Sequence, residues 1–184
     1  IAAQHEVRDV LLTGGDPLIM GTRRLGEILA ALRAIPHVQV IRLGSKIPAF
    51  NPFRILNDPE LQSVLREYST TEKRIYLMAH FDHPRELTEV AIEGLSTYLA
   101  CGVVAVNQCP LIKGVNDSVD AVVEMYRKLS FIGVPPYYLF QGRPTAGNEP
   151  YEVPIVRGFQ LFDAARKQCS GLAARARFCM SQAT

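Results

Sequence analysis

Short apolar runs alternate with amphipathic stretches along the whole chain of 184 residues. Six runs rich in β-branched, aromatic and aliphatic residues predict strands, and their starts are about 30 to 40 residues apart, which is the length of a strand plus a crossover helix. The predicted strands begin at Val7, Val38, Arg74, Val103, Pro135 and Arg175.

Helical periodicity fills the gaps between these runs. In residues 22–35, Leu and Ile recur every three or four positions, which predicts a helix with Thr22 as its N-cap. Asp58 followed by Pro59 predicts the start of another helix, and Gly102 predicts the end of a third. The predicted helices cover 22–35, 58–68, 87–100, 117–132 and 156–169.

The predicted strands are continuously apolar, which is typical of a parallel sheet covered by helices. Such a sheet is either a (β/α) barrel or a doubly wound sheet. Polar groups follow nearly every strand, which favours a barrel, because its strand ends converge on one mouth; a doubly wound sheet has one switch point. We therefore predict an α/β fold, a partial (β/α) TIM-like barrel. The strand-end groups are Gly14-Gly15-Asp16, Gly44-Ser45-Lys46, His80-Asp82-His83, Asn107-Gln108 and Gln141-Arg143.

Composition narrows the class of protein. The chain is 48% hydrophobic and 21% charged, which is typical of an ordinary packed protein. Its formal net charge of +2 gives no reason to expect nucleic acid or a membrane as a partner. No apolar run reaches the roughly 18 residues of a membrane span, and no signal-peptide pattern is present. The four cysteines lack metal-ligand spacing and so indicate no metal site. Without a secretory signal, we predict that they are reduced thiols in a cytoplasmic protein.

The run LLTGGDPLI, residues 11–19, has two interpretations. In the first, it is a turn between strand and helix in which Asp16 caps the following helix. In the second, the backbone of Gly14 and Gly15 and the carboxylate of Asp16 hold an ammonium or an amino-acid-like ligand. A phosphate-binding loop is excluded, because no G-K-[ST] follows and a carboxylate repels phosphate.

The run HFDH, residues 80–83, also has two interpretations. Imidazole and carboxylate groups are ordinary zinc or iron ligands. In the alternative, His80 hydrogen-bonds a ligand or backbone, while Asp82 and His83 cap the turn that Pro84 begins. His80 is nearest to the strand end and is therefore the residue of this run that we expect to point inward.

Amides and a lysine at other strand ends leave similar alternatives. Asn107 and Gln108 interrupt an apolar strand, so each contacts either a ligand or a neighbouring strand. Lys46 is either a Schiff-base lysine, as in barrel aldolases, or a solvated loop residue.

Taken together, the strand-end motifs resemble the lysine 2,3-aminomutase family of radical S-adenosylmethionine (SAM) enzymes. The motifs are LLTGGDPL, IPHVQVIRLGSKIP, AHFDHPRELT, VNQCPLIKGVND and VPPYYLFQ, in that order. The match runs from about Val7 to Arg143 and is fainter beyond. It implies reductive cleavage of SAM to a 5′-deoxyadenosyl radical, which abstracts hydrogen from an amino-acid-like substrate. A 1,2-amino shift assisted by pyridoxal phosphate (PLP) is left open.

The resemblance also implies roles for particular residues. The turn after the first predicted strand would cradle the methionyl amino group of SAM, and His80 would contact the ribose region. The lysine aminomutases carry an acidic residue where this chain has Arg143, so we expect a substrate carboxylate or phosphate there rather than a terminal ammonium. The expected cofactor-binding residues are Gly14, Gly15, Asp16, Ser45, His80, Asn107 and Gln108.

Two family elements are expected outside this chain. The C-x-x-x-C-x-x-C loop that holds a [4Fe–4S] cluster is expected before Ile1, and the PLP-binding lysine is expected after Thr184. Residues 1–184 are therefore interpreted as one radical SAM core domain, truncated at both ends and inactive alone.

Expected partners are a small substrate, a reductant such as flavodoxin or ferredoxin and, in a homo-oligomer, a second copy. Two rival hypotheses remain: a non-radical barrel enzyme that uses Lys46 or the HFDH run, and a non-catalytic relative that keeps the SAM pocket.

Overall fold

A computed structural model describes residues 1–143 and 145–180. Six strands form a sheet in the order β1-β2-β3-β4-β5-β6, and the neighbouring pairs whose register is described are parallel. A doubly wound sheet reverses its strand order at a switch point, whereas a (β/α) barrel keeps chain order, so the order agrees with the barrel prediction. The strands are β1 Asp9–Leu12, β2 Val40–Ser45, β3 Ile75–Ala79, β4 Val104–Pro110, β5 Pro136–Phe140 and β6 Arg177–Cys179.

Helices connect these strands. The five long helices lie where the periodicity predicted them, because each carries its own apolar stripe. The short α2 and α3 were not predicted, since a single turn is too short to show a period. The helices are α1 Thr22–Arg33, α2 Ile47–Phe50, α3 Phe53–Leu56, α4 Pro59–Tyr68, α5 Glu89–Ala100, α6 Val119–Phe131 and α7 Ile155–Lys167, with 3-10 turns η1 Pro17–Ile19, η2 Pro84–Glu86, η3 Glu149–Tyr151 and η4 Ala173–Arg175.

The helix ends confirm two predictions and correct a third. Asp58 caps α4 by accepting a hydrogen bond from the amide of Leu61, and Gly102 follows α5 with a φ of 79°. Thr22 was predicted as the N-cap of α1, and this is wrong: the cap position is Gly21, without a side-chain cap. The Thr22 hydroxyl instead donates to Asp58 at 2.5 Å, because Thr22 is buried on the side of α1 that faces this carboxylate.

The described chain divides into two compact units. Unit 1 contains Ile1–His80 and Thr88–Ala105, and unit 2 contains Phe81–Leu87 and Val106–Thr184. The single-domain interpretation of residues 1–184 remains a prediction.

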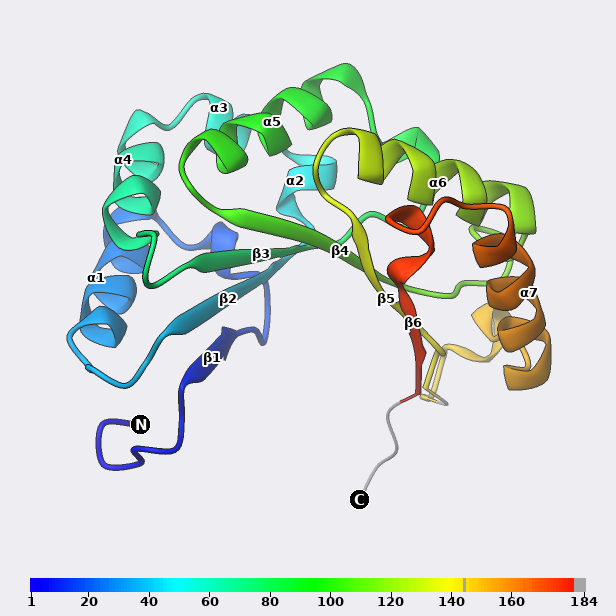
Figure 1. The fold of residues 1–184 in the computed structure, drawn as a ribbon, viewed down its shortest axis with the longest axis horizontal. Helices are drawn as coiled ribbons and strands as arrows, with labels where there is room; N and C mark the ends of the chain where they lie inside the picture. Colours follow the sequence, from blue (N-terminus) through cyan, green and yellow to red (C-terminus); the bar gives the residue numbers. More distant parts are fainter. Residues whose placement is uncertain (144, 181–184) are drawn as a thin grey trace. The chain divides into compact units, whose positions relative to one another are not determined.

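The core of unit 1 is formed by α1 and α4 against the sheet. These two helices lie side by side next to β2 and β3, as Figure 1 shows. A Cβ at Gly26 of α1 would lie 3.6 Å from the Val64 side chain of α4, so the helices approach closely. The fully buried side chains here include Leu25, Leu29, Ile41, Leu61 and Leu65.

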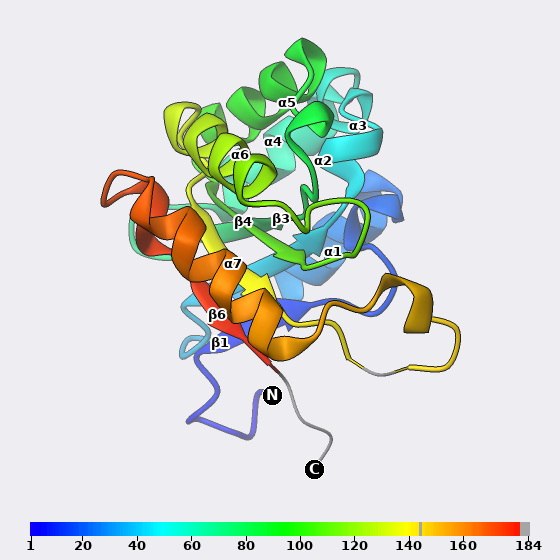
Figure 2. The same cartoon turned by 90° about the vertical axis from the view of Figure 1, so that its right-hand side faces the viewer.

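In unit 2, α6 and α7 pack against each other, and α7 lies along β6, as Figure 2 shows. The ring of Phe162 on α7 stacks on that of Phe178 on β6, with ring centroids 5.7 Å apart. Leu129, Leu139 and Leu161 are almost completely buried in this core.

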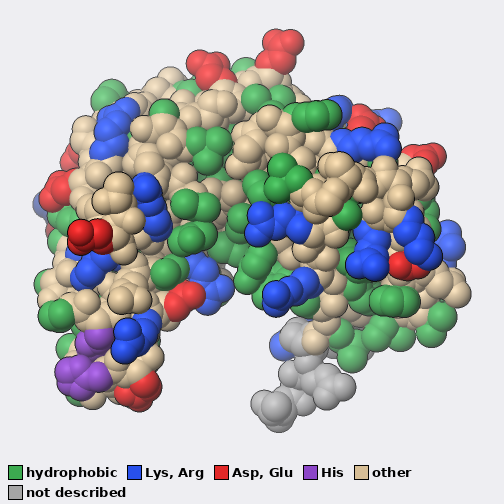
Figure 3. All heavy atoms as spheres, viewed as in Figure 1, with side chains coloured by type: hydrophobic (Ala, Val, Ile, Leu, Met, Phe, Trp, Pro, Cys, Tyr) green, Lys and Arg blue, Asp and Glu red, His purple; other side chains and the backbone are tan. Residues whose placement is uncertain are grey.

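The surface shown in Figure 3 carries Lys and Arg side chains interspersed with Asp and Glu, in keeping with a formal net charge of +2. Among the described residues, no helix has both the length and the apolar character that crossing a membrane requires.

Candidate functional site

The turn after β1 is open to a ligand. Gly14 and Gly15 have φ values of 88° and 80°, a backbone conformation that favours glycine. A Cβ at either position would meet nothing within 4 Å, and both residues are exposed. In the described part of the chain, neither glycine takes part in a backbone hydrogen bond. Their amides and carbonyls can therefore be approached closely by a polar ligand.

The Asp16 carboxylate ties this turn to the end of β2. One oxygen accepts from the Leu18 amide at 3.0 Å and from the Ser45 hydroxyl at 2.7 Å. The other oxygen accepts from the amides of Lys46 at 2.7 Å and Ile47 at 3.3 Å. Both oxygens thus have two protein donors, so Asp16 shapes the turn and also caps η1, as the first interpretation of the GGD run expected.

Residues at the ends of β2 and β3 support the same corner of unit 1. Ser45 is buried, and its hydroxyl also accepts from the Ile47 amide at 3.1 Å. The Lys46 ammonium donates to the carbonyl of His80 at 3.2 Å, so this lysine is held against the end of β3. His80 is half-buried directly after β3. Contacts of Ser45 and His80 with a cofactor remain predictions.

In unit 2, Asn107 connects β4 to the HFDH run. It is 1% exposed; its side-chain oxygen accepts from the Phe81 amide at 2.8 Å, and its side-chain nitrogen donates to the Phe81 carbonyl at 3.1 Å. The Asn107 side chain thus makes structural hydrogen bonds, to the backbone of the loop that follows β3. The register with β5 shifts between Asn107 and Gln108, and Gln108 is half-buried. A cofactor contact of either residue remains a prediction.

The remainder of the HFDH run forms a capped turn. His83 accepts a hydrogen bond from the Arg85 amide at 3.1 Å, and the Glu86 carboxylate accepts from the Asp82 amide at 2.5 Å. Asn116, fully buried, donates to the Asp82 carbonyl at 2.9 Å. Asn116 was not predicted as a site residue, because an asparagine in a loop gives no signal that it is buried. Within residues 1–143 and 145–180, no group of three or more His, Cys, Asp or Glu side chains could hold a metal ion.

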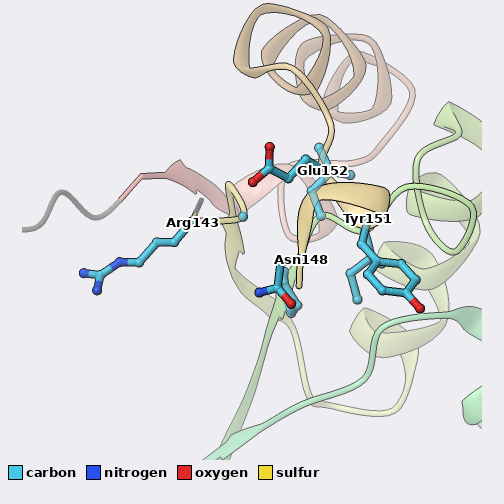
Figure 4. Close-up of a pocket in the computed structure, with 8 residues that line it drawn as sticks. Arg143, Asn148, Tyr151 and Glu152 are labelled. Carbon is cyan, nitrogen blue, oxygen red and sulfur yellow. The ribbon is translucent and has the colours of Figure 1, made fainter. Parts of the chain in front are cut away.

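Unit 2 has a pocket of about 360 Å³ at the end of β5, drawn in Figure 4. Pro110, Leu111 and Ile112 contribute its apolar part. Arg143 is exposed, and in Figure 4 its side chain extends away from that of Glu152. Arg143 is among the residues that line the pocket, but its guanidinium lies away from the side chains of Asn148 and Tyr151 in Figure 4.

The comparisons with known proteins bear on this geometry. No family model matches the chain. A protein of Aquifex aeolicus (strain VF5), whose name assigns it provisionally to the L-lysine 2,3-aminomutases, is 51% identical over 97% of this chain and 48% of its own length. The L-lysine 2,3-aminomutase of Clostridium subterminale is 39% identical over 90% of this chain and 38% of that enzyme. The glutamate 2,3-aminomutase of Clostridioides difficile (strain 630) is 33% identical over 94% of this chain and 40% of that enzyme.

This chain is a homologue of the lysine 2,3-aminomutases. The resemblance predicted from the strand-end motifs is therefore confirmed. The chain spans about half the length, or less, of these curated relatives.

Solved structures agree on the fold. A domain of pyruvate-formate lyase-activating enzyme from Bacteroides vulgatus ATCC 8482 matches with a TM-score of 0.58 at 14% identity, over 92% of this chain and 97% of that chain. A radical SAM methyltransferase from Sphaerobacter thermophilus matches with a TM-score of 0.51 at 17% identity, over 89% of this chain and 59% of that chain. The α/β partial barrel predicted from the sequence is confirmed.

Proposed function

We propose that this lysine 2,3-aminomutase homologue acts as a radical SAM enzyme of the aminomutase type, an isomerase. The observation that carries the proposal is the glycine turn after β1, which combines an open backbone with a carboxylate that fixes it in place. An ammonium needs acceptors, and the carbonyls at this turn supply them without a side chain in the way. The homology supplies the reaction class, in which SAM is cleaved reductively and hydrogen is abstracted from the substrate.

In this proposal the backbone of Gly14 and Gly15 binds the methionyl ammonium of SAM, and Asp16 holds the turn in the conformation that does so. Ser45 and His80 contribute to the SAM site from unit 1. Asn107 and Gln108 are proposed as cofactor-pocket residues of unit 2.

Two further cofactors follow from the family. A [4Fe–4S] cluster, when bound, supplies the electron for SAM cleavage; its thiolate ligands are proposed to lie outside this chain. Lys46, which lies at a strand end, already donates to the His80 carbonyl and is not proposed to bind PLP. A PLP-binding lysine is therefore also proposed to lie outside residues 1–184.

The proposed substrate is an amino acid that carries a second anionic group. Arg143 supports this proposal, because it lines the pocket, and a guanidinium turned toward a bound substrate would attract a carboxylate or phosphate and repel a terminal ammonium. One of the relatives is named glutamate 2,3-aminomutase, and glutamate is such an amino acid. A flavodoxin or ferredoxin as reductant, a cytoplasmic location and a homo-oligomeric state complete the proposal.

The test uses the complete protein, purified without oxygen. We expect iron and sulfide in the ratio of a [4Fe–4S] cluster, an electron paramagnetic resonance signal that changes when SAM is added, and release of 5′-deoxyadenosine with a reductant. A cluster signal that SAM does not change would overturn the proposal. SAM binding without 5′-deoxyadenosine would indicate a non-catalytic SAM-binding relative.

A further inference from the structure

The guanidinium of Arg54, on α3, holds the segment that follows the glycine turn. Its Nε donates to the carbonyl of Leu18 at 2.9 Å, and one Nη donates to the carbonyl of Met20 at 3.0 Å. Arg54 is 36 residues from Leu18 in sequence, so this link joins two connections of the barrel. The two carbonyls belong to η1 and the residue after it, which come directly after Asp16.

Arg54 is itself fixed by a compact network within unit 1. It forms an ion pair with Asp58, and its side chain is only 15% exposed. The same Nη donates to the Thr22 hydroxyl at 3.0 Å, and this hydroxyl donates to Asp58 at 2.5 Å. The Asp58 carboxylate also accepts from the Leu61 amide at 2.8 Å. A planar guanidinium with several fixed partners loses little further freedom, so it serves as a rigid anchor.

The glycine turn depends on what lies on either side of it. A Cβ at Gly14 or Gly15 would touch nothing within 4 Å, so side-chain packing at these two positions does not hold the turn. On one side it continues from β1. On the other side, Pro17 and Leu18 of η1 are buried, and η1 is also held at its start by the bonds of Asp16 and at its end by Arg54. Binding groups must be held within about 0.5 Å of their productive positions to be effective. Loss of the second anchor would let η1 and the turn move.

We propose that Arg54 is a positioning residue for the SAM-binding turn and acts on it through the carbonyls of Leu18 and Met20, without touching SAM. This inference rests on the proposed function of the turn. Neither the strand-end motifs nor the comparisons assign a role to Arg54.

The experiment compares two arginine variants of the complete protein. Arg54→Gln removes the hydrogen bonds to the two carbonyls. Arg33→Gln is the matched control, because Arg33 donates to three backbone carbonyls of the same unit, at the opposite ends of the strands: those of Tyr68 at 2.8 Å, Gln39 at 3.1 Å and Lys73 at 2.9 Å. Arg54→Gln also removes the ion pair with Asp58 and the bond to Thr22, whereas Arg33→Gln removes three bonds to backbone carbonyls. Both variants are therefore expected to lower the unfolding temperature.

The readout is the dissociation constant of SAM, measured by calorimetry at equal cluster content. We expect Arg54→Gln to raise it about tenfold and Arg33→Gln to leave it within about twofold. Arg54→Lys keeps the charge beside Asp58 but lacks the planar fork, so its value should fall between those of wild type and Arg54→Gln. It also serves as the variant of choice should Arg54→Gln fail to fold.

Each outcome separates the inference from the proposed function. Equal SAM affinity in wild type and the Arg54 variants would overturn the positioning role, as would an equal loss in Arg33→Gln. A wild-type protein that binds no SAM would instead overturn the proposed function of the turn.

Discussion

Replacement of Asp16 by asparagine keeps the shape of the side chain and exchanges one acceptor oxygen for an amide donor. In the structure each carboxylate oxygen faces two donors. Whichever way the new amide is oriented, its nitrogen meets donors. We therefore expect Asp16→Asn to loosen the connection between the glycine turn and the end of β2, although the substitution changes almost no volume.

The magnitude follows from the less costly orientation. With the amide nitrogen toward Leu18 and Ser45, the Ser45 hydroxyl can rotate to accept, but the Leu18 amide loses its partner and the remaining bonds lose their charge. A hydrogen bond to a charged group contributes about 1.5–3 kcal/mol, and Asp16 is partly exposed, so about 2 kcal/mol is expected. Asp16→Ala removes all four bonds and should cost more.

Hydrogen–deuterium exchange of the complete protein measures this locally. At about 1.36 kcal/mol per factor of ten, the amides of Leu18, Lys46 and Ile47 should exchange roughly 30-fold faster in Asp16→Asn. Asp117→Asn is the control, because Asp117 accepts one bond, from Gly114 at 3.0 Å, in an exposed loop of unit 2. That variant should leave the three amides unchanged.

The result that would refute this reasoning is exchange within twofold of wild type at all three amides in Asp16→Asn. The Asp16 carboxylate would then not hold the turn, and a direct role in ligand binding would become the better explanation of the GGD run.

Three further predictions concern stability. Asn107→Ala should lower the free energy of unfolding by about 2–4 kcal/mol in urea titrations, because both backbone groups of buried Phe81 lose their partner; a loss below 1 kcal/mol would contradict this. Tyr98→Phe should change stability by less than about 1 kcal/mol, because the buried hydroxyl has no hydrogen-bond partner among the described residues, and a larger loss would reveal one. Burial raises the pKa of Asp58, but hydrogen bonds from Thr22 and the Leu61 amide, together with Arg54, outweigh it and lower the pKa overall. The stability that Asp58 contributes is therefore present above its unfolded pKa of about 3.9 and is lost as pH falls through the lower folded value. The difference in the free energy of unfolding between wild type and Asp58→Asn should accordingly shrink from about pH 5 to pH 3.

The repeating strands and long helices could be predicted because their signals are local. A buried parallel strand is a short apolar run, and an amphipathic helix repeats its apolar residues every three or four positions, so a window of about fifteen residues contains the signal. Asp58 with Pro59 likewise predicts a helix start from adjacent residues, and the structure confirms that cap. The one-turn helices α2 and α3 were not predicted, because they have no such window.

The partners of the strand-end side chains could not be predicted in this way. The sequence identified Asp16 and Asn107 as polar positions that need partners, but it left a ligand and a structural hydrogen bond as equal alternatives. Their partners lie far along the chain: Ser45 is 29 residues from Asp16, and Phe81 is 26 residues from Asn107. No local pattern can show which backbone group a side chain will meet across such a distance.

The sequence by itself therefore determined the order of strands and helices, the motifs at the strand ends and, through them, the relationship to the lysine 2,3-aminomutases. Only the tertiary structure decided which polar side chains hold the fold, because hydrogen bonds depend on distance and direction in space. The clearest case is Arg54, which no motif singled out and which reaches carbonyls 34 and 36 residues away. Folding brings these connections together, and that proximity makes an ordinary surface-type residue an anchor of the candidate site.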